Sequence, residues 1–210
     1  MTTSITSNMR LYGRHYNDHH VGHGYVANNK KFAYLNIPKN GSSNIKKVFG
    51  GQHCHLSTEL QEFPECVLLI VLRDPVERFF SGCYEYLKRS YNGPLDAHLY
   101  PLLYDAKIFD EHTQHQHYFL DTIDTTNARY FYLDNKFSKR FEKSIGLRVQ
   151  QNHNNDWQKI PCGVPNREFK QGLVDYVTNN YGFAHLLNFY KKDAEIIQSR
   201  LDIDLFSVYK

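Results

Sequence analysis

Two short polar segments of this chain carry residue types that bind phosphate-like anions. The first is Lys39–Ser43, with the sequence Lys-Asn-Gly-Ser-Ser, and it follows an apolar run that Pro38 ends. Residues with helical spacing come next, and a helix N-terminus attracts anions through its N–H groups and its dipole. Gly41 permits close approach of the backbone, the serines cap the helix or donate hydroxyls, and Lys39 adds a positive charge. Taken alone, the segment also fits a lysine before an ordinary capped helix.

The second segment is Arg73–Ser81, with the sequence Arg-Asp-Pro-Val-Glu-Arg-Phe-Phe-Ser, and it follows six consecutive apolar residues. The fork-shaped guanidinium of Arg73 suits bidentate binding of a phosphate. Ser81 lies two helical turns further on, where it can hydrogen-bond the same group. Helical spacing places Ser81 on one face with Arg78 and Glu85. Taken alone, this segment also fits a surface Arg–Asp pair beside a proline that starts a helix.

Both segments follow predicted β-strands, and this order brings them together. Strands are predicted at 31–37, 67–72 and 129–133. The six apolar residues of 67–72 indicate burial on both faces, as in a parallel sheet covered by helices. In open α/β sheets, ligands bind at the carboxyl ends of the strands. We therefore expect Lys39 and Arg73 at one edge of the sheet, where they would bind two separated anionic groups of one ligand.

The spacing of apolar residues predicts the helices between and after these strands. They are expected near 45–49, 76–87, 109–120, 136–145, 167–178 and 183–201, the last with an apolar stripe that packs in the core. Alternating strands and helices predict an α/β fold with a mostly parallel central sheet. Residues 148–166 are loop-like. We expect a loose or wrapped polar segment over 1–30 and a single domain over 31–210.

Composition excludes several classes of protein. The formal net charge of +3 suits an anionic ligand and falls well short of the basic footprint of a nucleic-acid binder. The four cysteines form no Cys-x-x-Cys pair, which indicates free thiols in a reducing compartment. No apolar run approaches the ~20 residues that span a membrane, and the N-terminus lacks the apolar part of a signal peptide. We therefore expect a cytoplasmic chain.

Together, in this order and each after a predicted strand, the two segments resemble the sulfotransferases that use 3′-phosphoadenosine-5′-phosphosulfate (PAPS). Lys39–Ser43 matches that family's 5′-phosphosulfate loop, and the pattern Arg-Asp-Pro-x-x-Arg-x-x-Ser of Arg73–Ser81 matches its 3′-phosphate motif. The resemblance is closest to the carbohydrate sulfotransferases of the heparan sulfate 2-O type. It continues weakly at Gln116 and at Tyr190–Asp193, and covers about 31–200. It implies a P-loop-like three-layer fold.

The resemblance also implies roles for these residues. Lys39 would stabilise the oxygen between phosphate and sulfate as the bond to sulfur breaks, and the product would be 3′-phosphoadenosine-5′-phosphate (PAP). The 5′ phosphate would lie against the loop, and the 3′ phosphate against Arg73 and Ser81. The donor-binding set is therefore Lys39, Asn40, Gly41, Ser42, Ser43, Asn44, Arg73 and Ser81. The acceptor would be a hydroxyl on a carbohydrate or a small molecule, and the transfer needs no metal.

An acceptor hydroxyl needs a general base, and histidine is the commonest choice. In the resembled family a histidine between the two motifs often has this role. His55 is the first candidate here, His53 the second and His112 the third, and Glu59 is a carboxylate alternative. Adjacent side chains on an extended chain point apart, so the run His53, Cys54 and His55 does not predict a shared metal site.

Two other functions remain open at this point. A nucleotide-dependent phosphotransferase of the usual P-loop type needs Gly-Lys followed by Ser or Thr, whereas here the lysine precedes the glycine. A non-catalytic module that binds PAP or a glycan would need no turnover. The intact residues Lys39, Ser42, Arg73 and Ser81 argue against a degenerate enzyme.

Overall fold

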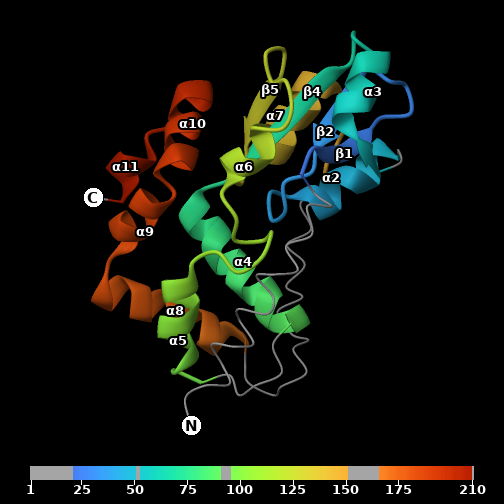
Figure 1. Ribbon diagram of the computed structural model, residues 1–210. Coiled ribbons are helices and arrows are strands. Elements are labelled where there is room, and N and C mark those ends of the chain that lie inside the picture. Colours follow the sequence, from blue (N-terminus) through green and yellow to red (C-terminus); the bar gives the residue numbers. More distant parts are fainter. Residues whose placement is uncertain (1–20, 51–52, 91–95, 151–165, 210) are drawn as a thin grey trace.

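The computed structural model describes residues 21–50, 53–90, 96–150 and 166–209 (Figure 1). These residues form an α/β fold around an open mixed sheet of five strands, in the order β3-β1-β2-β4-β5. The strands are β1 (His23–Val26), β2 (Phe32–Leu35), β3 (His53–His55), β4 (Val67–Leu72) and β5 (Arg129–Tyr132). The predicted strands at 31–37, 67–72 and 129–133 are therefore confirmed, two of them with somewhat shorter bounds.

The prediction of a mostly parallel sheet is not confirmed. β2, β4 and β5 are parallel neighbours, but β1 pairs antiparallel with both β2 and β3. The tight turn between β1 and β2 accounts for the first of these pairs, because Ala27 N–H donates to the Phe32 carbonyl at 2.8 Å and turns the chain back on itself. β1 lies inside the segment 1–30, which was expected to be loose or wrapped and was not predicted to contain a strand. Residues 1–20 of that segment lie outside the described residues.

Helices cover both faces of the sheet. One core cluster joins Tyr34, Leu69 and Val71 of the sheet to α2 (Ser42–Phe49) and α7 (Phe137–Ile145). The larger cluster, on the other face, includes Leu35 and Ile70. The helices around it are α3 (Leu56–Glu62), α4 (Pro75–Ser90), α5 (Leu99–Ala106), α6 (Gln116–Leu120), α8 (Asn166–Asn180), α9 (Phe183–Phe189), α10 (Lys191–Leu201) and α11 (Leu205–Val208).

β4 is buried on both faces of the sheet, as its run of six apolar residues predicted. Leu68, Ile70 and Leu72 belong to one cluster, while Leu69 and Val71 belong to the other. β4 is thus the central parallel strand between β2 and β5. Pairing with β2 on one side and with β5 on the other fixes β4 in the sheet. The segment that starts with Arg73 begins at the carboxyl end of β4.

Two predicted helices are wrong in their extent. The helix expected over 109–120 is present only as α6, because residues 110–115 form turns in which Asp110 accepts hydrogen bonds from the N–H groups of His112, Thr113 and Gln114. α5, which precedes these turns, was not predicted. The helix expected over 183–201 is two helices, α9 and α10, which meet at Tyr190. The apolar stripe nevertheless packs in the core: Leu187, Tyr190, Ala194 and Ile197 are buried, and Phe183 and Leu201 at its two ends are partly buried.

Among the described residues, no helix is both long enough and apolar enough to cross a membrane. The predicted loop over 148–166 lies mostly outside those residues, which resume at 166.

Candidate functional site

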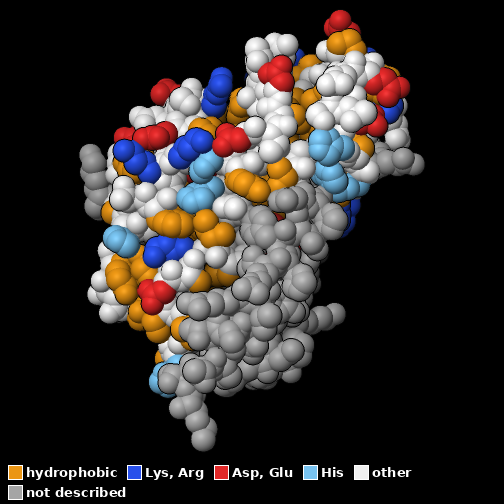
Figure 2. Space-filling model, in the orientation of Figure 1, with side chains coloured by type: hydrophobic (Ala, Val, Ile, Leu, Met, Phe, Trp, Pro, Cys, Tyr) orange, Lys and Arg blue, Asp and Glu red, His pale blue; other side chains and the backbone are white. Residues whose placement is uncertain are grey.

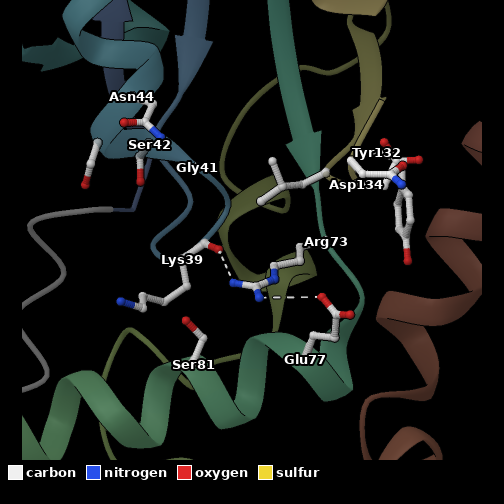
Figure 3. Close-up of a pocket in the computed structure, with 12 residues that line it drawn as sticks. Lys39, Gly41, Ser42, Asn44, Arg73, Glu77, Ser81, Tyr132 and Asp134 are labelled. Atoms are coloured by element: carbon white, nitrogen blue, oxygen red, sulfur yellow. Dashed lines mark hydrogen bonds and ion pairs between the residues drawn. The ribbon is translucent and has the colours of Figure 1, made fainter. Parts of the chain in front are cut away.

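A cleft of about 660 Å³ opens at the carboxyl ends of β2, β4 and β5 (Figure 3). It lies between the start of α2, the first turns of α4 and the segment after β5. Its lining residues are Lys39, Gly41, Ser42, Ser43, Asn44, Arg73, Glu77, Ser81, Tyr132, Leu133, Asp134 and Asn135. The structure therefore brings seven of the eight predicted donor-binding residues into one cleft.

The turn between β2 and α2 has an unusual backbone. Lys39 has φ 67° and Gly41 has φ 80°, so both are in the left-handed region that L side chains rarely adopt. Glycine meets this requirement at 41, where a Cβ would also lie 3.3 Å from the side chain of Leu133, which follows β5. Gly41 is the N-cap of α2, so the cap position offers no side-chain hydrogen bond. The serines were expected to cap the helix and to donate hydroxyls to a ligand; they do not cap α2, and both line the cleft.

In the Arg-Asp-Pro sequence after β4, Arg73 lines the cleft, whereas Asp74 and Pro75 form the start of α4. The Asp74 carboxylate accepts hydrogen bonds from the N–H groups of Val76 and Glu77 at 2.8 and 3.3 Å, which caps the helix that Pro75 begins. Burial raises the pKa of Asp74, and its second oxygen accepts a 2.6 Å hydrogen bond from the Tyr209 hydroxyl. The cap directs α4 along the floor of the cleft.

Arg73 connects the two predicted segments directly. Its Nη1 donates to the carbonyl of Lys39 at 3.2 Å, and its Nη2 lies 3.5 Å from the Glu77 carboxylate (Figure 3). Glu77 is largely exposed, with 62% of its side-chain surface accessible, so this ion pair is weak and easily exchanged. The guanidinium can therefore turn toward an anion in the cleft.

Arg78, on α4, also holds the turn between β2 and α2 in place. It is 1% exposed, and its Nε donates to the Pro38 carbonyl at 3.0 Å. Its two terminal nitrogens donate to the carbonyls of Gln114 and Glu111. Arg78 thus ties α4 to the β2–α2 turn and to the turns before α6, and it does not line the cleft.

Asn40, predicted to bind the donor, lies under the cleft instead of lining it. It is fully buried, and its Nδ2 donates to the Val71 carbonyl at 2.7 Å and to the Gln116 Oε1 at 2.6 Å. The Gln116 side chain also accepts from the N–H of Arg73 at 2.9 Å and donates to the Arg73 carbonyl at 2.8 Å. Asn40 and Gln116 therefore fix the two anion-binding segments relative to each other.

The lysine of the cleft is also paired. Lys39 Nζ lies 3.0 Å from Oε2 of Glu85, which comes one helical turn after Ser81 on α4. Both side chains are mostly buried, with 21% and 12% of their surfaces accessible. Glu85 is not one of the residues that line the cleft.

The last residue of β5 and the three residues after it form one wall of the cleft. This wall was not predicted from the sequence. Tyr132, Leu133, Asp134 and Asn135 come at the end of the third predicted strand and just beyond it, and β5 ends at the same edge as β4. Burial raises the pKa of the Tyr132 hydroxyl further above its ordinary value. The strand-end rule could have found this wall, because a strand was predicted at 129–133.

The predicted general bases do not line the cleft. β3 runs in the same direction as β2 on the far side of β1, so His55 ends β3 at the same edge of the sheet as the Lys39 turn. Its Nδ1 lies 2.7 Å from the Ser57 hydroxyl. The ring of His23 contacts those of His53 and His55, with centroids 5.1 and 5.0 Å apart, and Figure 2 shows histidines gathered over β1 and β3.

The other two candidates are engaged elsewhere. His112 is buried before α6, and its Nδ1 lies 2.9 Å from the Asp110 carboxylate. Its carbonyl lies so close to Gly82 of α4 that a Cβ there would be 2.5 Å away. Glu59 lies on α3, 3.5 Å from the ammonium of Lys30. Of the four candidates, only the first-ranked histidine ends a strand at the edge of the sheet where the cleft opens.

Comparisons of the chain with protein-family models, with curated protein sequences and with solved structures find no match. The chemistry of the cleft is therefore the basis for inferring a function.

Proposed function

We propose that this protein is a sulfotransferase that moves a sulfuryl group from PAPS to an acceptor hydroxyl. The observation that supports this most is the 3.2 Å contact between Arg73 and the Lys39 carbonyl, within one cleft. A ligand with phosphates at two ends of an adenosine needs two neighbouring groups of anion-binding residues. The volume of about 660 Å³ lies within the ordinary range of small-ligand sites.

In this proposal the residues of the cleft divide between the two ends of the donor. Ser42, Ser43 and the start of α2 hold the 5′ phosphate, while Arg73 and Ser81 hold the 3′ phosphate. The acceptor oxygen forms a bond to sulfur as the bond from sulfur to the bridging oxygen breaks, and the hydroxyl proton passes to a base. Lys39 neutralises the charge that develops on the leaving oxygen.

The binding mode predicts that Arg73 recognises the 3′ phosphate. We expect Arg73→Ala to weaken PAP binding by about 10- to 100-fold, because a bidentate charged contact is lost. Binding of adenosine 5′-monophosphate, which has no 3′ phosphate, should change by less than about 3-fold. Isothermal titration calorimetry with both nucleotides measures the difference.

Two further variants test whether a loss of PAP affinity in Arg73→Ala comes from the contact with the 3′ phosphate. Ser81→Ala should lose PAP affinity in the same direction without disturbing the Lys39 turn, and Arg129→Ala, on β5 outside the cleft, should bind PAP normally. Equal losses for both nucleotides in Arg73→Ala would contradict the assigned 3′ site. Tight PAP binding by a wild-type protein that never turns over PAPS would identify a binding module. Product formation from ATP without PAPS would identify a phosphotransferase.

We propose His55 as the general base, since it ends β3 at the same edge of the sheet as the cleft. His55→Ala is expected to lower turnover by roughly 100-fold or more while PAP affinity stays within about 2-fold, because a base acts on the acceptor and not on the donor. Turnover from labelled PAPS, beside calorimetry with PAP, tests this. His53→Ala and His112→Ala complete the series, with His98→Ala, at the start of α5 and outside the cleft, as the control. Normal turnover in all three candidates would reject a histidine base.

A further inference from the structure

Glu85 has no part in the donor contacts proposed above, yet it lies against the residue with the largest role. Its carboxylate is 3.0 Å from the Lys39 ammonium, and only 12% of its side-chain surface is accessible. It is one turn beyond Ser81 on the face of α4 that borders the cleft. In Figure 3 the Lys39 side chain extends over α4, with its ammonium directed away from the Arg73 guanidinium.

The backbone of Lys39 is held independently of Glu85. Arg73 donates to the Lys39 carbonyl, and Arg78 donates to the carbonyl of Pro38. The backbone conformation at Lys39 is itself unusual, with φ 67°. The side chain, by contrast, has a flexible four-carbon stem and can move between partners while its backbone stays in place.

We propose that Glu85 is a positioning residue that holds the Lys39 ammonium in the unliganded protein and takes it back when the product nucleotide leaves. This inference rests on the proposed function. The Lys39 ammonium pairs with the Glu85 carboxylate when the cleft is empty and with the oxygens of the nucleotide when it is bound. It therefore changes partner in each round of binding and release.

The burial of the pair gives the exchange its energetic consequence. When Lys39 moves to the donor, the Glu85 carboxylate loses an opposite charge at 3.0 Å while it stays mostly out of water. Separating two opposite charges in such surroundings is unfavourable. Glu85 therefore opposes nucleotide binding and favours release of PAP. A glutamine at this position keeps the size of the side chain and removes the charge, so Lys39 would remain on the nucleotide.

The test is a double-mutant cycle on PAP binding. We expect Glu85→Gln to tighten PAP binding by about 3- to 10-fold, mainly through slower dissociation. In a Lys39→Met background, the same change should alter PAP affinity by less than about 2-fold, because the ammonium for which the carboxylate competes is gone. With PAPS, Glu85→Gln should lower KM more than it changes kcat. Calorimetry and stopped-flow dissociation supply these values.

Glu77→Gln is the matched control, because it removes another carboxylate beside the cleft, one that contacts Arg73. Its effect on PAP affinity should be the same in the wild-type background and in the Lys39→Met background. An equal gain from Glu85→Gln in both backgrounds would mean a general charge effect and would overturn the inference. Unchanged or weaker binding in Glu85→Gln would overturn it as well.

Failure of the proposed function is recognised separately. If the wild-type protein and every variant fail to bind PAP, the sulfotransferase proposal is rejected and this inference falls with it. If the wild type binds PAP and the cycle shows no coupling between Lys39 and Glu85, only the positioning role is rejected. Thermal unfolding of each variant confirms that differences in affinity come from folded protein.

Discussion

Replacing Lys39 by methionine is expected to lower turnover from PAPS by roughly 100- to 1000-fold, the effect that loss of one charge-stabilising group in a pre-organised site typically has. Methionine keeps much of the length and the apolar stem of the side chain and removes the charge. In the proposed transfer, negative charge grows on the bridging oxygen only as the bond to sulfur breaks, so Lys39 acts mainly in the transition state. Release of PAP from labelled PAPS, with a glycan extract as acceptor, measures the rate.

Affinity for PAP separates this role from simple attraction. PAP lacks the sulfuryl group, so Lys39→Met should weaken its binding by no more than about 10-fold, much less than the loss in turnover. Lys46→Met, on the exposed side of α2, removes the same charge outside the cleft and should leave turnover within about 2-fold. A Lys39→Met protein with near-normal turnover would show that the cleft does not use this residue for chemistry.

The parts of the site that could be predicted from sequence are those that follow strands. The six apolar residues of β4 located a central strand, and Arg73 had to emerge at its carboxyl end. Pro38 was predicted to end the preceding strand, and β2 ends just before it, at Leu35. Since β2 and β4 are parallel neighbours, Lys39 and Arg73 meet at one edge, as predicted. Local signals were sufficient here because strand direction and strand end determine the geometry.

What was missed depends on contacts between distant parts of the chain. β1 and β3 are short, contain three histidines and carry little apolar alternation, so their pairing is decided by the sheet rather than by their own sequence. Asn40 sits in the middle of a predicted ligand-binding motif, yet its amide turns inward to Gln116, 76 residues away. No local pattern distinguishes such an amide from one that faces a ligand.

Arg78 belongs to the second motif, and the sequence assigned it no specific task. In the structure it is the buried donor to the carbonyls of Pro38, Glu111 and Gln114, which come from two segments far apart along the chain. Arg73 precedes α4 and lines the cleft, whereas Arg78 lies on α4 and turns into the interior. The interior arginine fixes two sides of the cleft, the Lys39 turn and α4, relative to each other.

Replacing Arg78 by methionine is therefore expected to destabilise the fold strongly, by about 3–5 kcal/mol. Three carbonyls lose a buried charged donor at once, and methionine cannot replace it. Arg78→Lys should recover little, because a single ammonium cannot reach three acceptors in the fork geometry of a guanidinium. Urea unfolding followed by circular dichroism gives the free energy of unfolding for each variant.

Arg140 provides a matched comparison for this prediction. It also donates to a backbone carbonyl, that of Tyr132 at 2.6 Å, and it forms two contacts with the Asp134 carboxylate at 2.8 and 3.1 Å. Its side chain is 41% accessible, so water can replace these partners. Arg140→Met should thus lower the free energy of unfolding by no more than about 1 kcal/mol. If Arg78→Met and Arg140→Met lowered the free energy of unfolding by similar amounts, burial would not explain the contribution of Arg78 to stability. The role given to Arg78 in holding the Lys39 turn against α4 would then be wrong.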